Sequence, residues 1–240
     1  MKIEKIYGFL DALSPFELQE EWDNSGLLTG SLDDEVEQVC ISLDIDSDMA
    51  DKALPKTLFI THHPLIFKGL KRLDFSRYPS NILKTLIQKN CALIAMHTNI
   101  DKTHLNRYVA ENILGFKIEK SEGFVCYFET DKSFDELASH IKKRLALDNL
   151  KVSKAHERIK RVAFCTGSGG DLIEKIEADC FISGDFKYHQ ALCANENKIS
   201  LIDIGHFESE RYFSQMLGEH LKNFPLKVII TNCKNPFEYK

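Results

Sequence analysis

Short apolar runs alternate with stretches of helical periodicity along the whole chain, and this alternation most constrains the fold. Chains of this kind fold into largely parallel sheets whose faces are covered by helices. The sequence therefore predicts an α/β protein with central sheets flanked by helices. The apolar runs that indicate strands lie at residues 38–43, 57–61, 92–96, 161–173, 178–185, 200–206 and 226–231.

Helical signals and length set the expected division of the chain. The stretch Ser14–Glu17 offers an N-cap, a first-turn proline and a capping glutamate, which predicts a helix running towards Trp22. The 240 residues suffice for two lobes, and we expect these to be residues 1–125 and 126–240. A second helix is expected between the predicted strands at 57–61 and 92–96, because four apolar residues there share one helical face: Ile82, Leu83, Leu86 and Ile87.

Composition excludes several functional classes. The net charge is −5 without a basic block, which argues against nucleic acid as the main partner. No run of 18 apolar residues indicates a membrane span, and the first residues lack the pattern of a signal peptide. The seven cysteines form an odd set without a C-x-x-C pair, as in a reducing compartment. We therefore expect a cytoplasmic protein.

Two adjacent histidines end one predicted strand, in the stretch FITHHPLIFKG at residues 59–69. Neighbouring side chains on a strand point to opposite faces, and Pro64 favours an extended His63. The rings of His62 and His63 are therefore expected to diverge, which suits two neighbouring metal ions better than chelation of one. Ligands of open α/β sheets bind beyond the carboxyl ends of strands, where these residues lie.

Similar residue types follow two further predicted strands. His97 and Asp101 follow the run 92–96, and His206 and Glu210 share one face if a helix starts after Gly205. Imidazole with carboxylate suits Zn²⁺, Fe²⁺, Mn²⁺ or Ni²⁺, and a carboxylate can bridge two such ions. Each signal alone also fits a hydrogen-bonded core histidine or a surface ion pair. Their recurrence at three strand ends favours a centre of two divalent metal ions.

Five motifs together resemble, in order and spacing, the NIF-three-like family, also called the type-two GTP cyclohydrolase I family. The resemblance implies two similar α/β lobes with a dinuclear metal site between them, in the compact form without an inserted domain. It also implies a ring-shaped homohexamer, a trimer of dimers. The motifs are WDNSGLLTG (22–30), THHPLIFKGLKRL (61–73), HTNID (97–101), RVAFCTGSGGDLI (161–173) and DIGHFESER (203–211).

The same resemblance assigns residues to roles. His97 falls on a further histidine of the site. Where the family tends to have T-G-E-x-x-H-H, this chain departs from the pattern, with a shortened acid at Asp185 and Tyr188 in place of the first histidine, but it keeps His189. The metal ligands, with Glu210 as the expected bridge, fall on His62, His63, Asp101, His206 and Glu210.

Three further features have two interpretations each. The glycine-rich stretch Thr166–Asp171 suits either an anion cradle or a tight turn. The basic residues in Lys68–Arg72 could neutralise a triphosphate, although such runs are more often solvated faces. Trp22, the only tryptophan, is expected in the core rather than stacked on a base.

The function implied by the resemblance is that of a metal-dependent hydrolase. The implied activity is that of GTP cyclohydrolase I of type 2, which converts GTP to dihydroneopterin triphosphate and formate through a metal-activated water. The catalytic residue that transfers protons would be His97 or His189, and the small-molecule substrate would be a nucleotide. Two alternatives stay open: a two-metal phosphatase or nuclease acting on a nucleotide, and a non-catalytic metal-binding interaction protein.

Overall fold

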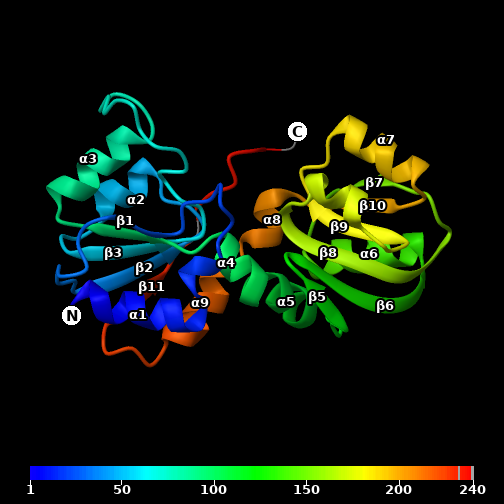
Figure 1. The fold of residues 1–240 in the computed structure, drawn as a ribbon, viewed down its shortest axis with the longest axis horizontal. Helices are drawn as coiled ribbons and strands as arrows, with labels where there is room; N and C mark the ends of the chain where they lie inside the picture. The colour runs from blue at the N-terminus through cyan, green and yellow to red at the C-terminus, as the bar shows by residue number, and fades with distance from the viewer. Residues whose placement is uncertain (232, 239–240) are drawn as a thin grey trace. The chain divides into compact units, whose positions relative to one another are not determined.

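The structure, a computed structural model, describes residues 1–231 and 233–238 (Figure 1). It separates into two compact units, Met1–Ile100 with Phe213–Lys240, and Asp101–Tyr212. This division differs from the expected lobes 1–125 and 126–240. The C-terminal segment belongs to the first unit because β11 (Lys227–Ile230) pairs there with β2 (Gln38–Ser42).

The sheet of the first unit has five strands in the order β1-β4-β3-β2-β11. Strands β2, β3 and β4 run parallel, β11 joins β2 in parallel, and β1 pairs with β4 in the antiparallel sense. Strands β2, β3 and β4 are buried along their whole length, so their sequences are continuous apolar runs rather than alternating ones. The remaining bounds are β1 (Gly26–Thr29), β3 (Thr57–Thr61) and β4 (Ala92–Ala95).

Helices cover both faces of this sheet, with α2 and α3 on one face and α1 and α9 on the other (Figure 1). Cys40, Phe59 and Leu93, one from each central strand, share a hydrophobic cluster with residues of α2 and α3. The predicted helical face in α3 is confirmed except at Ile87, whose side chain is exposed. The bounds are α1 (Ile3–Leu13), α2 (Ser47–Lys52), α3 (Ser80–Gln88) and α9 (Phe213–Leu221).

The predicted helix from Ser14 towards Trp22 is wrong. Ser14 instead ends α1, where its N–H donates to the Leu10 carbonyl. Only a single 3-10 turn, η1 (Phe16–Leu18), follows the proline. The chain then leaves helical geometry because its polar groups bond elsewhere: the Glu20 N–H donates to Thr98 Oγ1 at 3.0 Å.

The second unit contains a six-stranded sheet in the order β5-β6-β8-β9-β10-β7. Strands β8, β9 and β10 run parallel, whereas β5 pairs with β6, β6 with β8, and β7 with β10 in the antiparallel sense. The strands are β5 (Lys120–Glu122), β6 (Val125–Ser133), β7 (Lys151–Ser153), β8 (Arg158–Ser168), β9 (Cys180–Gly184) and β10 (Ser200–Asp203).

Helical segments of the second unit pack against this sheet. A hydrophobic cluster joins β6, β8, β9 and β10 to η4 and α7. None of the helices in the described chain has the length and apolar character needed to cross a membrane. The segments are η2 (Asp101–Leu105), α5 (Asn106–Tyr108), η3 (Val109–Ile113), α6 (Phe134–Arg144), η4 (Gly170–Lys175), α7 (Tyr188–Glu196) and α8 (His206–Glu210).

The two units repeat one arrangement of strands. In each, three parallel strands are followed at the sheet edge by an antiparallel strand beside the third, giving β2-β3-β4-β1 and β8-β9-β10-β7. The expected α/β fold with two similar lobes is confirmed. In both units the predicted polar site residues follow the carboxyl ends of these parallel strands, where chemistry is expected in α/β sheets.

Candidate metal centre

His62 and His63 come directly after β3, which ends at Thr61. The backbone N–H groups of both histidines lie 3.1 Å from the Leu43 carbonyl, so the chain turns along the end of the neighbouring strand. The ring centroids are only 5.0 Å apart, with their planes inclined by 50°. The expected divergence of the rings is therefore wrong, because the alternation of a strand stops before these two residues.

Each of these rings is held through its Nδ1 atom. His62 donates to the Met96 carbonyl at 2.9 Å, and His63 donates to Asp44 Oδ1 at 2.9 Å. Burial raises the pKa of the Asp44 carboxyl, but the hydrogen bond and charge of His63 outweigh it and leave this pKa below its ordinary value. A neutral ring that donates from Nδ1 carries its lone pair on Nε2, which is the form that binds a metal ion.

His97 is held in the same way by Asp23. Its Nδ1 donates to Asp23 Oδ1 at 2.7 Å, while the N–H and hydroxyl of Thr98 donate to the other carboxylate oxygen. Burial opposes ionisation of Asp23, yet these hydrogen bonds and the charge of His97 hold its pKa well below the ordinary value. One nitrogen each of His62, His63 and His97 lies within 4.8 Å of the others, so this trio could hold an ion.

The second unit brings a further histidine together with carboxylates. His206 opens α8, donates from Nδ1 to Asp185 Oδ2 at 2.8 Å, and places Nε2 3.0 Å from Glu210 Oε2. The predicted sharing of one helix face by His206 and Glu210 is thus confirmed. A carboxylate oxygen of Asp101 lies within 4.8 Å of one from Glu210, and Glu210 is buried.

The glycine-rich stretch that begins in the last residues of β8 serves close packing. Gly167 has a φ of +63°, and a Cβ atom there would overlap Glu210 Oε1. A Cβ atom on Gly169 would likewise overlap Ser183 Oγ. The structure therefore favours the tight-turn interpretation of this stretch, and Gly167 leaves the space that the Glu210 carboxylate occupies.

These donor sets fit divalent transition metals. Within the units, four imidazoles each have Nδ1 donating to an oxygen, and two carboxylates lie close to each other. Imidazole nitrogen with carboxylate oxygen is the combination that binds Zn²⁺, Fe²⁺, Mn²⁺ and Ni²⁺, and a fixed ring orientation increases affinity. The first unit supplies three imidazoles, and the second supplies one imidazole and two carboxylates.

Sequence reasoning missed the roles of Asp23, Asp44 and Asp185. Each accepts a hydrogen bond from a site histidine. Asp44 was visible as a polar residue directly after a predicted strand, and Asp23 lies inside the WDN motif, but an acceptor cannot be assigned to a ring before the fold is known. The shortened acid Asp185 is nevertheless long enough to reach His206 from a backbone φ of +59°.

Three other expectations have different outcomes. Trp22 is 57% exposed, so the expectation that it packs in the core is wrong. His189 is exposed and contacts the Tyr188 ring at 5.2 Å, and it is not part of the histidine trio described above. The basic side chains of Lys68, Lys71 and Arg72 are exposed, as on a solvated loop.

Comparison with known proteins gives whole-chain matches. A relative from Campylobacter jejuni named "GTP cyclohydrolase 1 type 2 homolog" is 59% identical over 240 residues, with 100% of both chains covered. A Helicobacter pylori protein (strain J99) named "GTP cyclohydrolase 1 type 2" is 45% identical over 238 residues, with 98% of each chain covered.

Solved structures match equally broadly. A Staphylococcus aureus hypothetical protein superposes with a TM-score of 0.90 at 29% identity, covering 100% of this chain and 99% of that one. Reduced HcgD from Methanocaldococcus jannaschii gives a TM-score of 0.82 at 27% identity, covering 96% and 97%. The sequence profile of one family spans residues 1–236, and with these relatives it shows that the chain belongs to the Duf34/NIF3 (NGG1p interacting factor 3) family.

Proposed function

We propose that the protein is a metal-dependent hydrolase that opens the guanine imidazole ring of GTP and yields formate and dihydroneopterin triphosphate. The observation that carries the proposal is the set of four imidazoles fixed through Nδ1, together with two neighbouring carboxylates. The names of the two bacterial relatives, both GTP cyclohydrolase 1 type 2 or a homolog of it, support the choice of reaction.

In this proposal two divalent ions are held by residues of both units. When bound, the ions supply Lewis-acid chemistry: they polarise substrate oxygen and lower the pKa of water. Glu210 would be the bridging carboxylate; it is buried, and a carboxylate oxygen of Asp101 lies within 4.8 Å of it in the same unit. The ligands are His62, His63, Asp101, His206 and Glu210.

His97 is the proposed proton-transfer residue. Its Nδ1 donates to the ionised Asp23, and a carboxylate in this position stabilises the imidazolium that forms when Nε2 accepts a proton. The alternative residue, His189, has no such carboxylate partner among its described contacts. A dyad of this kind can take a proton from water and return it to a leaving nitrogen.

The proposal is tested on protein reconstituted with Mn²⁺, Fe²⁺ or Zn²⁺ under anaerobic conditions. We expect formate from GTP, with the triphosphate retained in the product. Release of phosphate with an intact guanine ring would instead indicate a phosphatase, and bound metal without any product would indicate a binding protein.

A matched pair of variants separates proton transfer from metal binding. His97→Ala should lower turnover by about 100-fold or more while the metal content per chain stays unchanged. His156→Ala, which removes a ring bonded to the Lys198 carbonyl, is the control and should leave both unchanged. Loss of metal from His97→Ala would make His97 a ligand. The proposal extends to a homohexamer, whose molar mass light scattering can measure, and to a cytoplasmic location.

A further inference from the structure

Two large aromatic side chains lie exposed beside His97 in the first unit. Trp22 is 57% exposed and Phe67 is 41% exposed. The ring centroids of Trp22, Phe67 and His97 are 5.9, 6.3 and 6.2 Å apart in pairs, with interplanar angles of 57°, 78° and 79°. The contacts are tilted or edge-on, so no two of the three rings are stacked face to face.

The loop that carries Trp22 is fixed by hydrogen bonds on both sides of this residue. Before it, the Gln19 side chain bonds both the N–H and the carbonyl of Ser25. After it, the buried Asp23 carboxylate accepts from His97 and Thr98. An exposed indole on a loop held this firmly pays little conformational entropy when a ligand stacks on it.

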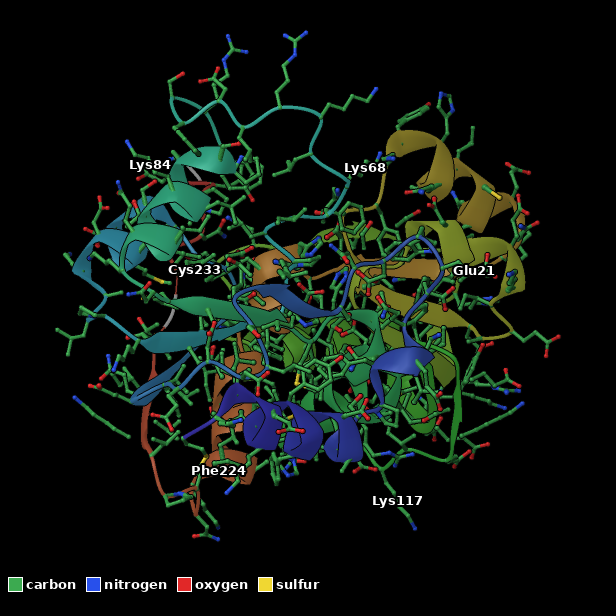
Figure 2. All side chains as sticks on the ribbon, turned by 60° about the vertical axis from the view of Figure 1, so that its left-hand side comes forward. Glu21, Lys68, Lys84, Lys117, Phe224 and Cys233 are labelled. Carbon is green, nitrogen blue, oxygen red and sulfur yellow. The ribbon has the colours of Figure 1, made fainter. Side chains whose placement is uncertain are left out.

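The loop that carries Phe67 is tied to the same framework. Asn24 Nδ2 donates to the Ile66 carbonyl at 2.6 Å, which links the residue two positions after Trp22 to the residue before Phe67. Figure 2 shows the exposed loops at Glu21 and Lys68, the direct neighbours of these two aromatic residues in the chain. The two rings are therefore presented together rather than on independently moving segments.

We propose that Trp22 and Phe67 form a stacking site for a planar heteroaromatic ring of the purine class, placed beside His97. Exposed indole and phenyl rings bind bases through stacking, because every base offers a flat π-face, whereas a phosphate group has none. That the purine is guanine rests on the proposed function. The site gives the base its position relative to the imidazole that transfers protons.

The sole tryptophan makes this proposal directly measurable. Metal-free protein is titrated with guanosine, with GTP and with inorganic tripolyphosphate while Trp22 emission is recorded. We expect saturable quenching by guanosine and GTP and none by tripolyphosphate. Quenching by tripolyphosphate equal to that by GTP, or no quenching by guanosine, would overturn the proposal.

Variants give a second readout, guanosine affinity by calorimetry. Trp22→Leu keeps an apolar side chain but loses the aromatic face, so binding should weaken roughly tenfold or more, and Phe67→Leu should weaken it less. Trp22→Phe should retain most of the affinity, which a merely structural role would not predict. Phe237→Leu, at an aromatic residue that is also exposed, is the control and should bind as the parent does.

Failure of this proposal and of the proposed function can be told apart. Guanosine binding that depends on Trp22, without formate release from GTP, supports the stacking site and refutes the cyclohydrolase. Formate release with an unchanged KM for GTP in Trp22→Leu supports the cyclohydrolase and refutes the stacking site.

Discussion

Individual carboxylates decide how the site histidines are presented. The aspartates at positions 44 and 46 show this well, because they are two residues apart yet have different partners. Asp44 accepts from the His63 ring at 2.9 Å, whereas Asp46 caps α2 by accepting from the Met49 N–H at 2.8 Å. The first orients a proposed ligand, and the second satisfies a helix end.

Substitution of these two aspartates should lower different quantities, metal affinity for Asp44 and stability for Asp46. Asp44→Ala should lower metal affinity by about 10- to 100-fold, with a smaller effect on the fold. Asp46→Ala should lower the free energy of unfolding by about 1 kcal/mol and leave metal affinity unchanged. Metal titration and denaturant unfolding of both variants check this. Equal metal affinity in the two variants would show that orientation of His63 by Asp44 is unimportant.

At the scale of elements, the parallel strands were the most predictable part of this chain, whereas the antiparallel strands β1, β5, β6 and β7 were not predicted. Central strands such as β2 and β3 are short, wholly buried runs, and their apolar composition is sufficient to identify them. The helix expected after Ser14 failed because the local capping signal is overridden by α1, which ends there. The pairing of β11 with β2 could not be predicted either, since the two strands lie far apart in the sequence.

The residues of the candidate centre were more accessible to prediction than their geometry. Polar residues after strand ends pointed to the histidines, and the motif resemblance supplied the proposed ligand roles. The orientation of His62 and His63 was not predictable, because it depends on where β3 ends and on hydrogen bonds to Leu43. The exposure of Trp22 was likewise hidden, because it results from the bonds of the flanking residues.

Gly167, near the end of β8, offers a test of how backbone geometry supports Glu210. Gly167→Ala combines a φ of +63° with overlap of the new Cβ atom and Glu210 Oε1, so it should reduce both stability and metal content. Gly123 has a φ of +56° with nothing within 4 Å of an added Cβ atom. Gly123→Ala therefore controls for backbone strain, at about 1 kcal/mol, and should retain all metal. Full metal content in Gly167→Ala would contradict the described packing.

At the scale of the whole molecule, the chain has two units built on one arrangement of strands, and each unit contains some of the proposed metal ligands. The proposed ligands of the first unit, His62 and His63, are imidazoles, and the carboxylates near the histidines there, Asp23 and Asp44, accept hydrogen bonds from the His97 and His63 rings. The second unit supplies the proposed carboxylate ligands, Asp101 and Glu210. Direct ligation by a carboxylate would therefore use residues of the second unit, and this is the physical reason for proposing joint use of ligands from both units.

Joint use predicts that one carboxylate controls both ions. In Glu210→Ala, the loss of the bridge should remove ions from the histidines as well, leaving well under one ion per chain. His63→Ala should mainly empty one position, since the other ligands remain. Elemental analysis of purified variants measures this, with Glu219→Ala, at an exposed acid, as the control. If Glu210→Ala retained one tightly bound ion that His63→Ala lacked, the two units would hold separate sites and the bridging role of Glu210 would be wrong.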